Sequence, residues 1–149
     1  SGRPPEVEES FQDRRLGDEL GLVGLALGGD RLSPGQDLCL TLAWRALVQM
    51  GNDYELEVRL VDGAGQTVWA QSGQPFDGHS LTSWWRPGRT QYLRYQVALP
   101  AGLPAGSYHL LAGAREPATG RTLPPRGPSL EGWPDLLLVT TLQAEGQTP

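Results

Sequence analysis

The chain has 149 residues and a formal net charge of −5, from 17 acidic residues against 12 bases, all of them arginine. This length fits one domain that is stable without disulfides or structural metal, and the single cysteine excludes an internal disulfide. Acidic charge without a basic cluster argues against nucleic acid and anionic lipid as partners, and no apolar run is long enough to span a bilayer.

The order of turn residues and apolar runs predicts the elements. Residues 1–15 are charged and poor in apolar residues, so they are expected to form a linker or lead-in. Seven runs bounded by turn-forming residues follow and predict strands over 19–27, 37–46, 54–62, 66–71, 90–99, 107–115 and 135–143. Two long connections, 73–88 and 116–134, separate the later strands, and residues 144–149 are expected to form a flexible tail.

Apolar residues alternate with polar ones along most of these runs, which is typical of strands with one buried face. A Pro-(x)-Gly turn precedes three of them, at 33–35, 86–88 and 104–106. The sequence therefore predicts an all-β fold, a single antiparallel β-sandwich of about seven to nine strands over residues 16–143, immunoglobulin-like or jelly-roll-like. The inward faces are expected to carry Leu38, Leu40, Leu42, Trp44, Tyr54, Leu56, Val58, Leu60, Tyr95, Val97, Leu99, Tyr108 and Leu110.

Three residues outside this pattern carry simple structural expectations. Cys39 alternates with its leucine neighbours and is expected to face the other side of its strand as an inert residue. Trp69 could face either side of its strand. Trp133, which lies beside Pro134 in a loop, is expected to cover a sheet edge or an open end.

No catalytic set stands out. Residues 78–82 (Gly-His-Ser-Leu-Thr) approach the nucleophile elbow of serine hydrolases, but the final glycine and the strand-to-helix context are missing. His109 is expected in mid-strand, and Asp77 and His79 lack the spacing of a zinc pair or a calcium loop. We therefore expect no enzyme activity in this chain, no metal site and no cofactor.

The connection 73–88 concentrates aromatic and polar side chains. Indole faces stack on sugar rings or prolines, while Asp, His and Arg supply directional hydrogen bonds. This mixture predicts a carbohydrate- or peptide-binding patch, yet one of two adjacent tryptophans is also needed to plug the open end of a sandwich. We expect Trp84 to be the plug and Trp85 to be more exposed. The candidate ligand-binding residues are Asp77, His79, Thr82, Trp84, Trp85 and Arg86.

A succession of fragments carries a resemblance to a known family: ELGLVGLAL, SPGQDLCLTLAWRAL, YELEVRLVDGAGQTV, QPFDGHSLTSWWRPG, YQVALPAGLPAGSYHLLAG and PATGRTLP. Over residues 16–143 the chain resembles the C-terminal soluble domain of bacterial multi-spanning membrane glycosyltransferases. These enzymes are similar to dolichyl-phosphate-mannose protein mannosyltransferases and aminoarabinose transferases. The more specific parts are a Pro-x-x-Gly-x-x-x-Thr-x-x-Trp-x-Pro-Gly loop and a Leu-Pro-x-x-Leu-Pro-x-Gly-x-Tyr turn.

The resemblance implies a non-catalytic accessory domain outside the cytoplasm, periplasmic or at the cell surface, because sugar transfer in that family belongs to the membrane-embedded portion. Its expected partners are a glycan or lipid-linked sugar and the membrane portion of the parent protein. The chain departs from the family pattern at Ser72, Arg89 and residues 115–117, so contacts made by acidic residues at those positions are not carried over. The alternative is a freestanding interaction or protease-inhibitor module that grips a partner chain through loops or a sheet edge.

Overall fold

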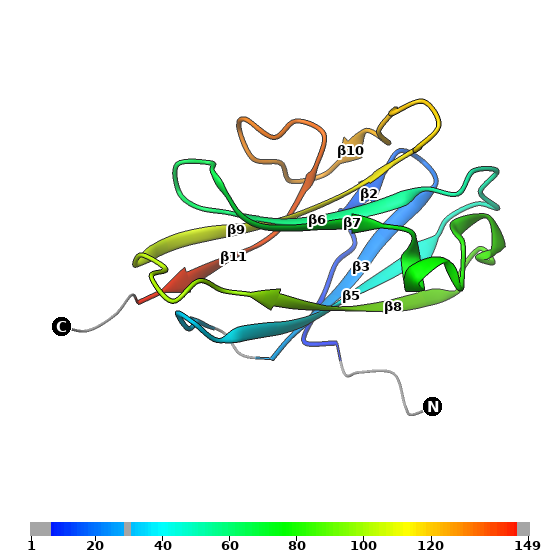
Figure 1. Ribbon diagram of the computed structural model, residues 1–149. Helices are drawn as coiled ribbons and strands as arrows, with labels where there is room; N and C mark the ends of the chain where they lie inside the picture. Colours follow the sequence, from blue (N-terminus) through cyan, green and yellow to red (C-terminus); the bar gives the residue numbers. More distant parts are fainter. Residues whose placement is uncertain (1–6, 29–30, 146–149) are drawn as a thin grey trace.

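The computed structural model describes residues 7–28 and 31–145, which form two β-sheets packed face to face (Figure 1). The described residues contain eleven strands and two short 3-10 helices. No helix in these two ranges is both long enough and apolar enough to cross a membrane. The fold is thus all-β, as the alternating sequence pattern predicts.

The first sheet has the strand order β10-β2-β3-β5-β8, and β1 pairs with the same β3. Its pairs are all antiparallel. The strands run over Glu9–Ser10 (β1), Arg15–Leu16 (β2), Leu20–Leu27 (β3), Asp37–Ala46 (β5), Thr90–Ala98 (β8) and Pro125–Arg126 (β10).

The second sheet has the strand order β4-β11-β9-β6-β7. One of its pairs, the short contact of β4 with β11, is parallel, and the other pairs are antiparallel. The strands run over Arg31–Leu32 (β4), Glu55–Val61 (β6), Thr67–Gly73 (β7), Gly106–Arg115 (β9) and Leu137–Ala144 (β11).

The seven strands predicted from the sequence are all present, with ends within two residues of the predicted ones, and all thirteen residues expected to face inward are buried. Trp44 is fully buried, whereas Cys39 on the other side of β5 is exposed. Trp69 is half-buried and packs against the main core from β7. Burial of one face on each sheet therefore supplies most of the driving force for folding.

The expected lead-in is not separate from the sandwich where the structure describes it. Residues 9–10 and 15–16 pair with β3, and Phe11 between them is buried. The Arg14 guanidinium lies 3.9 Å from the centre of the Phe11 ring, and its Nε donates to the carbonyl of Leu138 at 3.0 Å. One buried aromatic residue and one arginine thus attach this charged stretch to both sheets. At the other end, Ala144 of the expected tail is buried in β11, and residues 146–149 lie outside the described residues.

Residues 116–136, which we call the β9–β11 segment, fold over the outer face of the second sheet. They cover a small apolar cluster that includes Val61, Leu111 and Leu136. A Cβ atom at Gly113 would lie 2.5 Å from Leu136 Cδ2 and 3.1 Å from the Asp135 carbonyl oxygen, so a side chain there would displace Leu136 and crowd the backbone of the segment.

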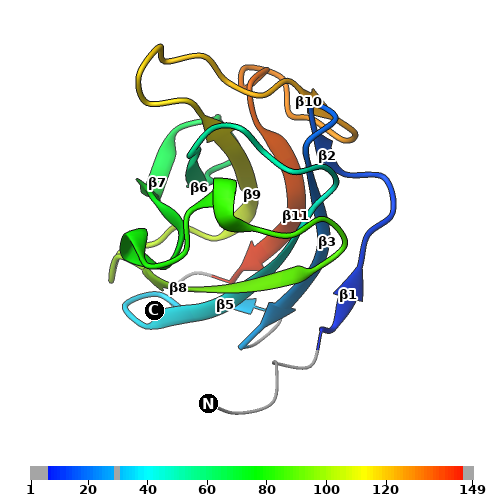
Figure 2. The same cartoon turned by 90° about the vertical axis from the view of Figure 1, so that its right-hand side faces the viewer.

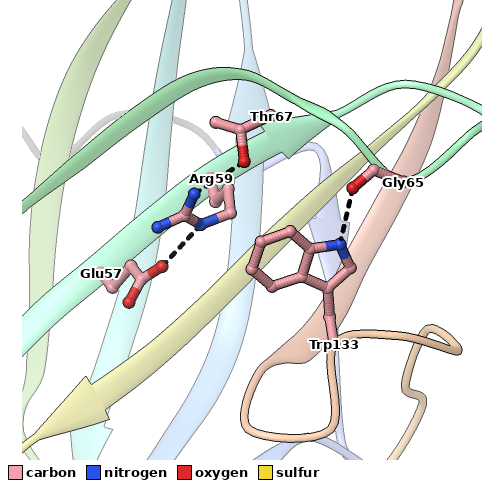
Figure 3. A network of polar contacts seen from close by, with 5 residues as sticks. All are labelled: Glu57, Arg59, Gly65, Thr67 and Trp133. Carbon is pink, nitrogen blue, oxygen red and sulfur yellow. Dashed lines mark hydrogen bonds and ion pairs between the residues drawn. The ribbon is translucent and has the colours of Figure 1, made fainter.

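Trp133 packs against the small cluster, and Figure 3 shows its polar contacts. Its Nε1 donates to the Gly65 carbonyl at 3.1 Å, and the Arg59 guanidinium lies 4.8 Å from its ring centre. Arg59 is held in turn by Glu57 and Thr67, at 2.7 Å each. Trp133 therefore covers a sheet face, not the edge or open end expected from its loop position.

Candidate functional site

The β7–β8 loop, residues 74–89, lies at one end of the sandwich beside the β5–β6 connection, and Figure 2 looks onto this end. The hydroxyl of Thr82 accepts from the Tyr54 backbone N–H at 2.9 Å and donates to the Asn52 carbonyl at 2.7 Å. The Gly88 N–H donates to the Ala46 carbonyl at 2.9 Å. These bonds, made over sequence distances of 28 to 42 residues, fix the loop as a rigid cover.

The two adjacent tryptophans of the loop face opposite ways. Trp85 is 1% exposed, and its Nε1 donates to the carbonyl and the hydroxyl of Ser80, both at 3.2 Å, whereas Trp84 is 62% exposed. The expectation that one of the pair plugs the sandwich end is confirmed, but the choice of Trp84 as the plug is wrong.

The 3-10 turn over Thr82–Trp84 explains why Trp85 is the buried tryptophan of the pair. In a 3-10 turn, side chains three residues apart eclipse one another, so Trp85 lies on the same side as the buried Thr82, and Trp84 projects away.

The six candidate residues divide into an inner and an outer group. Thr82 and Trp85 are buried and structural, whereas the other four are exposed: Asp77, His79, Trp84 and Arg86. No hydrogen bond or ion pair joins Asp77, His79 and Arg86 in the described ranges, so their polar groups are open to a ligand or to water.

The loop conformation offers no support for hydrolase or metal chemistry. Residues 78–82 lie between two 3-10 turns, not at the strand-to-helix turn that exposes a nucleophile. His109 Nδ1 lies 2.9 Å from the Thr141 hydroxyl on β11, and Ser80 is bonded to the Trp85 indole N–H. Within residues 7–28 and 31–145, no three His, Cys, Asp or Glu side chains gather as a metal site would require.

Sequence reasoning missed a groove beside the loop. A cavity of about 240 Å³ opens between β7 and β8, which are the edge strands of the two sheets on this side. Residues 71–77 and 93–95 line it, together with Leu56. We call it the β7–β8 groove. The one signal in the sequence is that β7 places Gln71 and Gly73 where inward-facing apolar residues would close the sandwich.

The roof of the groove has an unusual backbone. Phe76 and Asp77, in the 3-10 turn Pro75–Gly78 (η1), have φ of 55° and 54°, the left-handed region that non-glycine residues rarely adopt. Pro75, just before them, is buried, while Phe76 is 38% exposed at the mouth of the groove.

Burial raises the pKa of two tyrosines on this side of the molecule. Burial raises the pKa of the Tyr95 hydroxyl, which lies between the sheets and lines the groove, far above its ordinary value. The pKa of Tyr54 is raised too, by burial first and also by Glu19, whose carboxylate accepts its hydrogen bond at 2.9 Å. Both phenols therefore stay neutral donors at physiological pH.

No protein-family model matches the sequence, and no curated protein matches it. Among solved structures, the fold is similar to the C-terminal domain of wzt, with a TM-score of 0.62 and 15% identity over 98% of this chain and 84% of that one. It is also similar to a Niemann-Pick type C2 protein from the Japanese carpenter ant, with a TM-score of 0.51 and 11% identity over 91% and 98% of the chains. At these identities the similarity establishes the β-sandwich fold alone.

Proposed function

We propose that this chain is a non-catalytic accessory domain of a bacterial membrane glycosyltransferase, placed outside the cytoplasm, that contacts a glycan through the loop end of its sandwich. Two observations support the parent assignment. The ordered family-like fragments extend over residues 16–143, and a structure of similar fold is the C-terminal domain of another protein.

The exposed indole of Trp84 carries the binding proposal. All four large apolar side chains that are exposed in the described residues lie on the two loops of this end: Leu47, Val48, Phe76 and Trp84. Isolated exposed apolar residues are ordinary on a protein surface, but a grouping at one end marks an interaction surface. Trp84 is the most exposed of them and is held on a loop fixed from beneath by Thr82 and Trp85.

Sugar rings present apolar C–H faces that stack on indoles, and their hydroxyls need directional partners. Asp77, His79 and Arg86 are exposed on the same loop and supply an acceptor, a group that both donates and accepts, and a charged donor. Stacking on one aromatic ring contributes on the order of 1–3 kcal/mol in related cases, which suits weak binding to a glycan presented at high local density.

A binding screen with oligosaccharides and lipid-linked sugars tests this surface. Wild type should bind at least one, Trp84→Ala should lose most of that affinity, and Trp84→Phe should keep most of it because it retains an aromatic face. Unchanged melting temperatures of both variants would show that the fold is intact. Equal binding by wild type and Trp84→Ala would contradict the proposed surface.

The parent assignment has its own test. The gene that encodes this chain should also encode several helices of about 20 apolar residues upstream, in the same reading frame. A pull-down with the full-length protein from its host should recover membrane components. Recovery of one soluble partner chain instead would favour the freestanding interaction module.

A further inference from the structure

We propose that the β7–β8 groove is a binding site for a single ring of a neutral saccharide. This site borders the Trp84 surface at Phe76 and Asp77 but is centred on the groove, and it does not depend on which parent protein carries the domain. Its floor, its polar groups, its roof and its charge each support the assignment.

The groove exists because the second half of β7 lacks the large inward-facing side chains that would fill the space between the two sheets. Trp69 faces Leu60 across the β6–β7 pair, Gln71 faces Val58, and Gly73 faces Leu56, so side chains at these positions point between the sheets. Along β7 the side chain at these positions is therefore an indole at Trp69 and an amide at Gln71, and Gly73 has none. A Cβ atom placed on Gly73 would have no other atom within 4 Å, so the missing side chain leaves open space.

One buried polar atom beside this space lacks a partner. Gln74 donates its amide N–H to the Asp53 carbonyl at 3.3 Å, but its buried carbonyl oxygen accepts no hydrogen bond. Tyr95 is 7% exposed, and its hydroxyl makes no hydrogen bond in the described ranges. Buried polar groups in native proteins are nearly always paired, so the unpaired Gln74 oxygen, beside a tyrosine hydroxyl that has no protein partner, points to a ligand that supplies hydroxyls.

The roof is held in a conformation that costs energy. Consecutive left-handed residues that are not glycine are strained, and such strain concentrates at ligand clamps. Here it places the partly exposed Phe76 and the neighbouring Asp77 in the lining of the groove. An aromatic face beside a carboxylate is a common arrangement for one face of a sugar ring and its hydroxyls.

Charge and volume narrow the ligand class. Asp77 and Arg94 are the two charged residues lining the groove, and their opposite signs leave it formally neutral, which disfavours phosphates, uronic acids and amino sugars. A volume of about 240 Å³ is below the range typical of drug-sized ligands and suits one ring. An extended peptide would instead use the unpaired backbone along β7 or β8, and the groove covers only a few residues of each.

Titration followed by amide NMR tests the site, with glucose, mannose and galactose as probes and glucuronate and glucosamine as charged controls. We expect at least one neutral sugar to shift the amide signals of residues 71–77 and 93–95. Gly73→Leu should weaken that binding about tenfold or more, because its side chain would fill the space that Gly73 leaves open. Gly102→Leu is the matched control, since Gly102 also has open space around it but lies in the turn between β8 and β9.

A second variant keeps the site open and removes one polar group. Tyr95→Phe should lower affinity about two- to tenfold through the loss of one hydrogen bond, with no loss of fold. Trp84→Ala should leave groove binding unchanged, so failure of the Trp84 surface and failure of the groove are separable. The proposal is overturned if no neutral sugar shifts these signals, if Gly73→Leu binds as wild type does, or if only the charged sugars or an added peptide strand bind there.

Discussion

The β7–β8 loop and the β9–β11 segment are both long connections that carry tryptophan, yet they use it differently. In the β9–β11 segment, Trp133 turns down onto the second sheet, donates its Nε1–H to Gly65 and stacks on Arg59. In the β7–β8 loop, Trp85 is satisfied in the same way by Ser80, while Trp84 stays 62% exposed. An indole whose N–H and face are both occupied by protein is structural, and Trp84 is the exception because its ring is left exposed.

Within the β7–β8 loop, structural residues and exposed residues are also separated, and they correspond to motif positions and to the positions between them. The motif positions shape the loop: Pro75, Thr82 and Trp85 are buried, and Gly78 and Gly88 have φ of 85° and 84°. The positions between them carry the exposed groups Phe76, Asp77, His79, Trp84 and Arg86. The motif positions therefore shape the loop, and the intervening positions supply its exposed groups.

The largest expected effect belongs to the buried indole of this loop. Trp85→Ala should lower the free energy of unfolding by about 3–5 kcal/mol, because it leaves a cavity beneath the loop and frees Ser80. Denaturant unfolding measures the loss, and Trp85→Phe should recover much of it. A loss of unfolding free energy as small as that expected for an exposed residue would contradict the structural role of Trp85.

A second variant tests whether the hydrogen bonds of the Thr82 hydroxyl hold the same loop. Thr82→Val keeps the shape but leaves the Tyr54 N–H and the Asn52 carbonyl unpaired, so unfolding free energy should fall by about 1–3 kcal/mol. Thr82→Ser retains the hydroxyl and should lie close to wild type. Equal stability of the valine and serine variants would mean that the loop is not held through this hydroxyl.

Trp133→Ala should have a smaller effect, because its ring is only partly buried. Loss of the stacking with Arg59 and of the hydrogen bond to Gly65 should lower unfolding free energy by about 1–2 kcal/mol. Faster amide hydrogen exchange should be confined to the β9–β11 segment and the β6–β7 turn. Exchange that accelerates throughout the main core would contradict a local role for this residue.

Trp84→Ala should change stability least, by about 0.5 kcal/mol or less, because an exposed ring buries little on folding. Thermal unfolding of wild type and variant in parallel measures the difference. A large drop in melting temperature would assign Trp84 to the structural class and remove the contrast between the loops.

The period-2 pattern was sufficient to predict the main strands and the core, since residues such as Leu40, Val58 and Val97 alternate in runs long enough to reveal one face. The strands β1, β2, β4 and β10 have two residues each and carry no periodic signal. Two of their pairings, β2 with β10 and β4 with β11, join residues more than a hundred positions apart. Arg14 likewise bonds to the distant Leu138 carbonyl.

The candidate site was partly visible in the sequence. The exposure of Asp77, His79 and Arg86 agrees with their polarity, but the assignment of Trp84 and Trp85 depends on where the 3-10 turn begins. The β7–β8 groove was not predicted, because it is formed by two edge strands of different sheets. Gly73 signals it only once its position opposite Leu56 is known.

The position of β11 has a consequence for biosynthesis. It is the last of the described strands in the chain, yet it lies inside its sheet, between β4 and β9. Chains emerge from the ribosome N-terminus first. The edge of β9 therefore stays unpaired, and Leu110 stays incompletely covered, until residue 144 has been made. The second sheet therefore closes late during translation, and a nascent chain stalled before β11 exposes a pairing edge to chaperones or to neighbouring chains.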